Sequence, residues 1–476
     1  MADIVLAAIN AKWIHPSLAL RLLKANLGPL EDRCQILEFA LRQPLPEKTV
    51  PILAARPRIL GLSVSIWNHL ATLELLDALD AAWTEAPRSC GGRPLIILGG
   101  PEVSYLPPEA EIIKRADWVV QGEGEAVFRE LCMRFLEDSP SDAVGRSDRG
   151  AIRELSSAAS IQGAVISAKP VDPAALVPAY RLYSGEDLCR KLVYVEASRG
   201  CPFGCEFCLS SLDKAVREFP LEPFLEEMDR LIRRGARTFK FLDRTFNLDI
   251  ERAGRIMEFF LTRLAEAPSL CVHFEMVPSR FPPELRKPLV RFPPGSLRLE
   301  VGIQTFNRET AALIGRPCDP EAELEALRFL GSNAIVHADL IAGLPGEGLA
   351  SFGEGFDRLW TAGPGEIQAG VLKRLPGTPL ARRGEAWGMR FSPDPPYEVL
   401  ETAALSAPEL DRIKNFARFW ERIVNRGVFQ DLGPRLFPKG QPVFQSFLER
   451  SDRLLTRFGR NWGIDRRELR AELENQ

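Results

Sequence analysis

The sequence lacks the features that mark several classes of protein. No uninterrupted apolar run reaches about 18 residues, the length expected of a membrane-spanning helix, and the start MADIVLAAIN lacks the basic residues of a signal peptide. Charge is nearly balanced, with 61 basic and 64 acidic residues and a net charge of -3. Such a balance indicates no nucleic-acid or membrane partner. We therefore expect a cytoplasmic protein without a membrane span, acting as a monomer.

Cysteine is scarce and unevenly placed. Of nine cysteines, three fall close together at Cys201, Cys205 and Cys208. The others stand at positions 34, 90, 132, 189, 271 and 318, a scatter and an odd total that favour reduced core thiols over a disulfide framework. Because no second cysteine pair or nearby histidine accompanies the three, a closed structural zinc site with four ligands is not indicated.

The chain is longer than one hydrophobic core usually supports, so we expect several domains. Its N-terminal part alternates strand-like and helix-like segments, which is typical of a parallel sheet with crossover helices. The expected strands cover 3–10, 35–41, 58–68, 95–100 and 118–125. This pattern predicts an α/β doubly wound domain, flavodoxin-like or Rossmann-like, over residues 1–138. Ligands of such a sheet lie at the carboxyl ends of its strands.

A change of composition follows, and residues 139–188 are expected to form a linker or connecting lobe. A second alternating series then begins, with strands expected at 191–198, 238–247, 271–277, 297–305, 336–345 and 367–376. Six such units predict a partial (β/α)6 barrel of the TIM type over residues 189–400. Residues 401–476 are expected to be helical, with aromatic side chains that serve mainly as core.

The segment ASRGCPFGCEFCLSS places three thiols in one tight loop directly after an expected strand. Three thiolates leave one metal position open, so a 4Fe-4S cluster with one free iron is the most economical interpretation. The loop resembles that of the radical S-adenosylmethionine (SAM) superfamily, which has Cys-x3-Cys-x-aromatic-Cys, the aromatic residue here being Phe207. The resemblance implies that Cys201, Cys205 and Cys208 hold the cluster, and that SAM binds the open iron and yields a 5′-deoxyadenosyl radical.

Further segments resemble the superfamily in the expected order. They are FLDRTFN, LEVGIQTFN, DLIAGLPGE and RLPGTP. The first departs from the family, which usually has a Gly-Gly-Glu-like segment there. The resemblance implies the following SAM contacts: Phe207, Asp243, Asn247, Glu300, Gln304, Gly343 and Leu344. For Glu300 an ion pair with an arginine inside the barrel stays open as an alternative.

A doubly wound domain ahead of such a barrel resembles the cobalamin-binding radical SAM enzymes, through the segments SVSIWN, ILGGPEVS and VVQGEGEAVFREL. Cobalamin domains of the methionine-synthase kind carry Asp-x-His-x-x-Gly after the first strand, where this chain has NAKWIHPS. His15 is therefore a candidate cobalt ligand, with Trp67, Asn68 and His69 as rivals, and a cobalt without a protein ligand is also known. The implied cobalamin contacts are Ser63, Ser65, Trp67, Asn68, Gly99, Gly100, Pro101, Glu102, Gly122, Glu123 and Gly124. A domain that only docks the barrel stays an alternative.

The resemblance implies a methyltransferase acting on an unactivated carbon or phosphorus of an unknown small-molecule or peptide substrate, with flavodoxin or ferredoxin as electron donor. One SAM would methylate cobalt, a second would give the radical, and the substrate would lie between the cluster loop and the corrin. Ring contraction, cyclisation or oxidation without net methylation would use the same cofactors. A methylthiotransferase would need a second cluster on Cys34, Cys90 and Cys132, which lie far apart in the sequence. An iron-sulfur redox protein without enzymatic activity is the remaining alternative.

Overall fold

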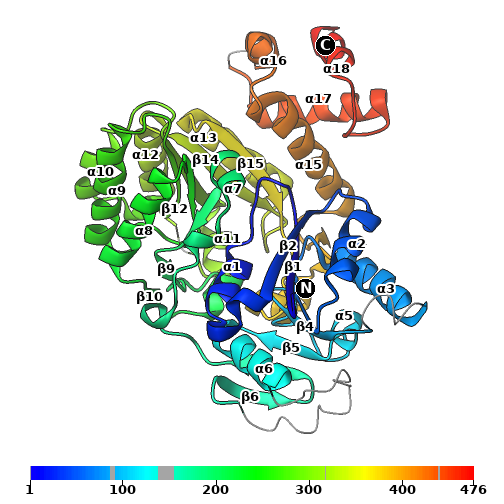
Figure 1. Ribbon diagram of the computed structural model, residues 1–476. Coiled ribbons are helices and arrows are strands. Elements are labelled where there is room, and N and C mark those ends of the chain that lie inside the picture. Colours follow the sequence, from blue (N-terminus) through cyan, green and yellow to red (C-terminus); the bar gives the residue numbers. More distant parts are fainter. Residues whose placement is uncertain (1, 86–91, 138–154, 317, 438–439, 476) are drawn as a thin grey trace. The chain divides into compact units, whose positions relative to one another are not determined.

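The computed structural model describes residues 2–85, 92–137, 155–316, 318–437 and 440–475 (Figure 1). The chain divides into two compact units. Unit 1 comprises Met1–Ser198 and Arg217–Lys240, and unit 2 comprises Arg199–Val216 and Phe241–Gln476. Among the described residues, no helix combines the length and the apolar character needed to cross a membrane.

Unit 1 contains a seven-stranded sheet with the order β2-β1-β3-β4-β5-β7-β6. The strands are β1 (Ile4–Asn10), β2 (Cys34–Ala40), β3 (Ile59–Ser63), β4 (Leu95–Gly99), β5 (Trp118–Gln121), β6 (Ala158–Gln162) and β7 (Val165–Ala168). The five strands expected from the sequence are confirmed and pair in parallel. Within the segment 139–188, expected as a linker or connecting lobe, residues 158–168 add a hairpin to the sheet, because β7 pairs in parallel with β5 and β6 is antiparallel to β7.

Helices cover both faces of this sheet, which confirms the doubly wound fold. One apolar core joins the sheet to α1 (Leu18–Ala25) and α6 (Glu125–Glu137). The other joins it to α2 (Leu45–Ala55), α3 (His69–Glu85) and α5 (Glu111–Lys114). Strand β1 is buried along nearly its whole length, since its side chains alternate between the two cores. Because both of its faces are buried, the sequence of β1 is a continuous apolar run.

The barrel sheet has six strands in the order β15-β14-β13-β12-β11-β8. They are β8 (Val193–Val195), β11 (Thr238–Phe241), β12 (Cys271–Met276), β13 (Leu297–Gln304), β14 (Ile335–Ala342) and β15 (Glu366–Val371), as expected. A second pair, β9 (Ser198–Arg199) and β10 (Arg217–Glu218), brackets the cysteine loop. The helices are α7 (Gly185–Arg190), α8 (Leu221–Arg233), α9 (Ile250–Leu264), α10 (Pro283–Leu289), α11 (Arg308–Leu313), α12 (Pro320–Gly331) and α13 (Leu349–Ala362).

In β12, β13 and β14 every second side chain is buried and the others are half-buried. The buried set is apolar, for example Phe274, Leu299 and Ala338. The half-buried set contains His273, Glu300 and other charged residues. Because side chains alternate between the faces of a strand, one face of this sheet is an apolar core and the other is polar.

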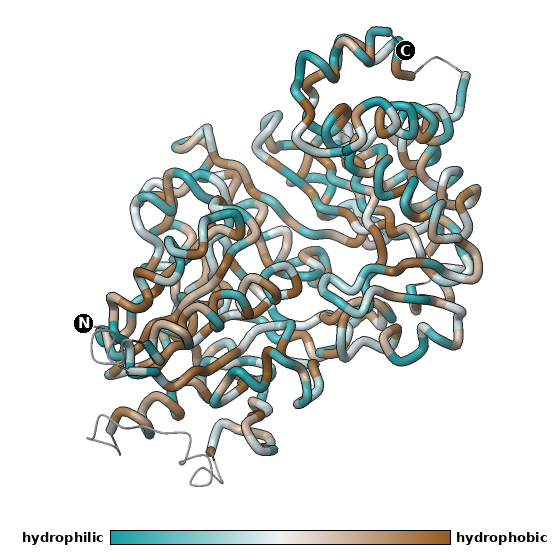
Figure 2. The backbone as a smooth tube through the Cα atoms, turned by 90° about the vertical axis from the view of Figure 1, so that its right-hand side faces the viewer, coloured by the Kyte–Doolittle hydropathy of each residue, from teal (hydrophilic) through white to brown (hydrophobic). Residues whose placement is uncertain are grey.

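The C-terminal part of unit 2 is mainly helical, as expected. It contains α14 (Pro379–Arg383), β16 (Arg390–Phe391), β17 (Val399–Glu401), α15 (Ala407–Trp420), α16 (Gly433–Leu436), α17 (Val443–Phe458) and α18 (Arg466–Asn475). Teal and brown alternate along these helices in Figure 2, as amphipathic helices require. Phe356 of α13 packs against Phe416 and Trp420 of α15 at centroid distances of 4.9 and 4.7 Å. These aromatic residues form core, as the sequence predicts.

Candidate functional site

The three clustered cysteines lie in one irregular loop of unit 2. The Cys201 amide donates to the Asp213 carbonyl at 2.9 Å, so the first cysteine is joined to a residue that follows the third. Cys205 is buried, whereas Cys201 and Cys208 are partly exposed. The Cys201 sulfur lies 3.9 Å from the Thr245 hydroxyl, which follows β11. The loop thus presents two accessible thiols and one buried thiol next to a strand end of the barrel.

A positive charge adjoins the buried thiol. Nη1 of Arg316 lies 4.0 Å from the Cys205 sulfur, and Nη2 of Arg316 donates to the Gly302 carbonyl on β13. Burial raises the pKa of Cys205, the Arg316 guanidinium opposes this rise, and the thiols of Cys208 and Cys201 add to it. Arg316 therefore favours the thiolate, which is the form that binds metal.

The backbone on the far side of the loop is fixed to two other segments. The Glu206 amide donates to the Ile314 carbonyl, and the Glu206 carbonyl accepts from Leu380 of α14, both at 2.9 Å. The Glu206 carboxylate also pairs with Arg383 at 3.1 Å. These bonds hold the middle of the cysteine loop in place, as a metal-binding loop requires.

The donor set fits an iron-sulfur cluster better than a single ion. Across the described ranges, no three His, Cys, Asp or Glu side chains converge closely enough to hold one metal ion. The thiolates of a 4Fe-4S cluster each bind a different iron, so they lie farther apart than the ligands of one ion. Three soft thiolate donors on a short loop, without a fourth, match that requirement.

The end of β13 carries a strained glutamine. Gln304 has a positive φ of 71° at a register shift between Gly302 and Gln304. Its Oε1 is buried and has no hydrogen-bond partner among the described residues. A non-glycine residue held in this conformation costs about 1–3 kcal/mol, and such strain clusters at ligand sites. Both features fit the expectation that Gln304 contacts SAM, which stays a prediction.

A buried carboxyl group holds the next residue. Thr305 donates to Oε1 of Glu347 at 2.7 Å, and Ser351 donates to the same oxygen at 3.2 Å. Burial raises the pKa of Glu347 to about 6, although these hydrogen bonds oppose the rise. Glu347 thereby ties the end of β13 to the turn after β14, which contains the GLPGE segment.

The polar face of the barrel sheet bears a row of ion pairs. Glu300 lies 3.4 Å from His273, so a histidine is one of its charged neighbours. Burial would lower the pKa of His337, but hydrogen bonds with Asp339 and Glu366 and the charge of Glu300 raise it to about 10. This face is therefore charged, unlike the branched apolar layers that fill a complete barrel.

Other expected SAM contacts have partners within the protein. The amide group of Asn247 exchanges hydrogen bonds with the Val277 backbone at 2.9 and 3.0 Å, so it joins the ends of β11 and β12. Leu344 is fully buried in the core. At Gly343, where φ is +86°, a Cβ would lie 2.5 Å from Val399 of β17. The structure gives these three residues structural partners, while Asp243 is buried and Phe207 is half-buried.

A hollow of about 350 Å³ lies beside the end of β11. Its lining residues are Asn247, Leu248, Ile250, Ser279, Phe281 and Pro282. It follows the carboxyl ends of β11 and β12, which is where ligands of a parallel α/β sheet are expected.

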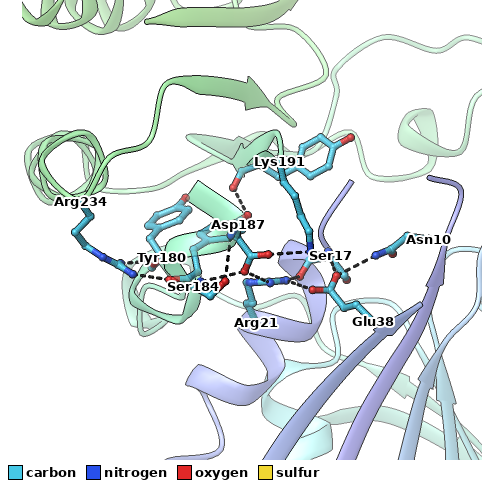
Figure 3. Close-up of polar contacts among 11 residues, drawn as sticks. Asn10, Ser17, Arg21, Glu38, Tyr180, Ser184, Asp187, Lys191 and Arg234 are labelled. Atoms are coloured by element: carbon cyan, nitrogen blue, oxygen red, sulfur yellow. Dashed lines mark hydrogen bonds and ion pairs between the residues drawn. The ribbon is translucent and has the colours of Figure 1, made fainter. Parts of the chain in front are cut away.

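In unit 1, the loop after β1 is anchored at both ends (Figure 3). Glu38 accepts hydrogen bonds from the Asn10 side chain and the Ser17 amide. Arg21 pairs with Glu38 at 2.8 Å and with Asp187 at 2.9 Å. Burial would raise the pKa of Asp187, but the hydrogen bonds from Lys191 and the Ser184 amide and the charge of Arg21 lower it to about 2.

His15 lies in this anchored loop. Its Nδ1 is 2.8 Å from the Tyr194 hydroxyl, and the two rings are stacked with centroids 6.0 Å apart. Burial, followed by the positive charges of Lys12 and Lys240, lowers the pKa of His15. The neutral imidazole is thus favoured at neutral pH, and a neutral imidazole nitrogen is what a metal ion binds.

Large apolar side chains are exposed in the loops after three adjacent strands of unit 1. Trp13 and Ile14 follow β1, Trp67 and Leu70 follow β3, and Tyr105 follows β4, with exposed fractions from 38% to 57%. Parallel strands end at one edge of a sheet, so these side chains share the edge at which a doubly wound fold binds its ligand. Exposed apolar groups gathered in this way indicate a binding surface, and they suit a large flat cofactor.

Several expected cobalamin contacts also hold the loops in shape. Asn68 bonds to the backbone of Ile9, Ser63 and Ser65, and Glu102 pairs with His69 at 2.8 Å. Glu123 binds Arg217 with both oxygens at 2.8 Å. At Gly100, with φ at +108°, a Cβ would lie 2.5 Å from the Val64 carbonyl. The neighbouring backbone therefore requires a glycine at this position.

The remaining expected positions lie at the same strand ends. Trp67, Pro101 and Gly122 are exposed and Ser65 is buried, whereas Ser63, Gly99 and Gly124 are half-buried. Sequence reasoning missed Arg316, Tyr194 and Glu347, whose partners lie far away in the chain. A lone arginine or tyrosine carries no spacing signal, so only the folded structure reveals these contacts.

Comparison with known families divides the chain in the same way. Residues 4–132 match the B12 binding domain, and residues 195–359 match the radical SAM superfamily. Residues 385–447 match a family of unknown function, DUF4080. The first two matches imply cobalamin, a 4Fe-4S cluster and SAM as cofactors.

Individual relatives are similar over part of their length. The chain is 25% identical over 365 residues to the cobalamin-dependent radical SAM methyltransferase TokK of Streptomyces tokunonensis, covering 72% of this chain and 51% of TokK. It is 29% identical over 207 residues to an uncharacterized methyltransferase of Pyrococcus horikoshii, covering 41% and 42%. The chain thus spans about half the length of the curated relatives it matches.

A solved structure shares the fold. It is the cobalamin-dependent S-adenosylmethionine radical enzyme OxsB with aqua-cobalamin bound, with a TM-score of 0.66 and 17% identity over 98% of this chain and 74% of OxsB. The cysteine loop, the barrel strands and the doubly wound domain agree with these matches. The chain thus combines a B12-binding domain with a radical SAM domain, and it is similar to radical enzymes that carry both.

Proposed function

We propose that this chain is a cobalamin-dependent radical SAM methyltransferase that acts on an unactivated carbon, or on phosphorus, of a small-molecule or peptide substrate. One observation carries the proposal: a single chain combines the three-thiol loop beside the barrel strands with a B12-binding domain whose strand ends expose apolar side chains. The names of TokK and the Pyrococcus protein favour methyl transfer over ring contraction, cyclisation or oxidation.

The residues of unit 2 would bind and orient the cluster and SAM. When bound, the cluster supplies an electron for SAM cleavage and cobalamin supplies the methyl group, with flavodoxin or ferredoxin as the reductant. Cys201, Cys205 and Cys208 would hold the cluster, and Arg316 would keep Cys205 as a thiolate. Gln304, fixed by the bulge in β13, would donate or accept a hydrogen bond to SAM.

The residues of unit 1 would hold cobalamin. Trp13, Trp67 and Tyr105 would pack against the corrin or its nucleotide, and His15 would offer Nε2 to cobalt if Nδ1-H donates to Tyr194. A hydrogen-bond partner on the other ring nitrogen orients a metal-binding histidine. Absorption spectra of bound cobalamin test the ligand: His15→Ala should change the spectrum of the wild-type complex, and an unchanged spectrum would show that His15 is not a ligand.

A methylthiotransferase function has less support from the structure. It would need a second cluster on the N-terminal cysteines, yet Cys34 and Cys132 are both buried in one apolar core of unit 1. Burial raises the pKa of Cys34 to about 12 and that of Cys132 well above its usual value. Cys90 lies outside the described residues. This burial in an apolar core disfavours the thiolate, which is the form that binds metal.

The proposal is tested with anaerobically reconstituted protein, cobalamin, a reductant and SAM that carries a deuterated methyl group. Wild-type protein should produce 5′-deoxyadenosine and should transfer the label to cobalamin, and then to a component of a cell extract that mass spectrometry identifies. Cys208→Ala should lose the cluster absorbance and 5′-deoxyadenosine formation. Cys189→Ala, which alters an exposed cysteine outside the loop, is the matched control and should retain both.

Two results would contradict the proposal. Label that reaches neither cobalamin nor any extract component, although 5′-deoxyadenosine forms, would favour the radical enzymes without net methylation. A protein that holds its cluster but does not cleave SAM would revive the redox function.

A further inference from the structure

The C-terminal helices of unit 2 contain a buried arginine without a counter-ion. Arg450 of α17 is only 7% exposed. Its Nε and Nη1 atoms are buried, and neither has a hydrogen-bond partner in the part of the chain that the structure describes. An arginine cannot lose its proton to escape this situation. A cation that is removed from water without an anion destabilises the fold, so an anion is needed at this position.

The acidic side chains of the same region are committed elsewhere. Asp431 and Glu474 pair with Arg470, Asp452 pairs with Arg412, Glu472 pairs with Arg457, and Glu449 accepts a hydrogen bond from Gln445. None of these carboxylates reaches the buried guanidinium atoms of Arg450. The missing anion therefore comes from outside these helices.

Two further arginines add positive charge beside Arg450. Arg453 lies one turn along α17, and Arg435 lies on α16, where it donates to the Glu474 carbonyl. Both side chains are exposed. Burial, followed by the charges of Arg453 and Arg435, lowers the pKa of Arg450. The two neighbouring positive charges thus destabilise the unpaired Arg450 guanidinium further, and they would attract an anion.

We propose that Arg450, Arg435 and Arg453 form a binding site for a phosphate group between α16 and α17. A guanidinium donates several hydrogen bonds in one plane, and Nε and Nη1 of Arg450 both have no acceptor among the described residues. A dianionic phosphate balances more of the three positive charges than a carboxylate does. This site does not depend on the proposed methyl transfer.

The test follows thermal unfolding of the whole reconstituted protein with inorganic phosphate or acetate at constant ionic strength. Phosphate should raise Tm with the logarithm of its concentration, by about 3 °C when its concentration is about 100 times Kd, and acetate should have a smaller effect. Arg450→Met should abolish the phosphate effect and should raise Tm in phosphate-free buffer, because it removes an unpaired buried charge. Arg418→Met, an exposed arginine on α15, should respond to phosphate as the wild type does.

The proposal is overturned by a wild-type Tm that is independent of phosphate, by an undiminished phosphate effect in Arg450→Met, or by an equal effect of acetate. If Arg450→Met does not fold, Arg435→Gln replaces it. That exposed substitution should weaken phosphate binding about tenfold, and an unchanged affinity would overturn the proposal. Tighter binding of glycerol phosphate than of inorganic phosphate would assign the site to an organic phosphate, and the reverse order to the free ion.

Discussion

Replacing Arg21 by Met should destabilise unit 1 strongly. The Arg21 side chain is 5% exposed and pairs with Glu38 and Asp187, which are 12% and 8% exposed. Removing one partner of a buried ion pair costs about 3–5 kcal/mol, because a buried charge is left uncompensated. Asp187 keeps Lys191 at 2.9 Å, so the stranded charge is mainly that of Glu38. We therefore expect a loss at the lower end, about 3 kcal/mol of unfolding free energy.

Urea unfolding of the whole protein measures this loss. Arg33→Met is the matched control, since Arg33 pairs with Asp3 at 2.7 Å but both side chains are about one third exposed. That surface pair should be worth less than about 1 kcal/mol. Adding Glu38→Gln to Arg21→Met should recover part of the loss, because it neutralises the stranded carboxylate. A loss in Arg21→Met no larger than that in the Arg33 control would refute the reasoning.

Three further predictions concern pH and backbone strain. The pKa of Asp187 is lowered to about 2. Its ionised form therefore contributes stability that is complete above the ordinary carboxyl pKa of about 4 and is lost as the pH falls toward 2. Asp187→Asn should make the unfolding free energy less dependent on pH in this acid range. The pKa of His337 is raised to about 10. The stability that its protonated form contributes is therefore complete below about pH 6.5 and is lost as the pH rises through 10. His337→Gln should lessen the fall in stability between neutral pH and pH 10. Gly343→Ala should cost about 1–3 kcal/mol more than Gly363→Ala in urea unfolding, because a Cβ at Gly343 would meet Val399 at 2.5 Å whereas Gly363, also at positive φ, faces open space.

Much of the fold could be predicted because its signals are local. Buried parallel strands such as β1 and β4 are short apolar runs, and Gly and Pro punctuate them. The spacing of Cys201, Cys205 and Cys208 is likewise visible in fifteen consecutive letters. The hairpin of β6 and β7 was not predicted, because its residues are half-exposed and mixed in polarity. Its place in the sheet is set by pairing with β5, not by its own pattern.

The detailed site could not be predicted, because its partners are distant in sequence. Glu123 and Arg217 are 94 residues apart, and Cys205 and Arg316 are 111 apart. A conspicuous polar residue at a strand end has two possible uses, a ligand or the loop itself. Asn68 and Glu123 hydrogen-bond within the protein, and a single sequence offers no means to foresee such a bond.

We propose above that three thiols of this chain hold the 4Fe-4S cluster that cleaves SAM to a radical. The most direct measurement is 5′-deoxyadenosine formation by anaerobically reconstituted wild-type protein, compared with Cys205→Ala and Cys189→Ala. We expect product from the wild type and from Cys189→Ala, and none from Cys205→Ala. Equal product from Cys205→Ala, or no product from a wild-type protein that holds its cluster, would contradict this proposal.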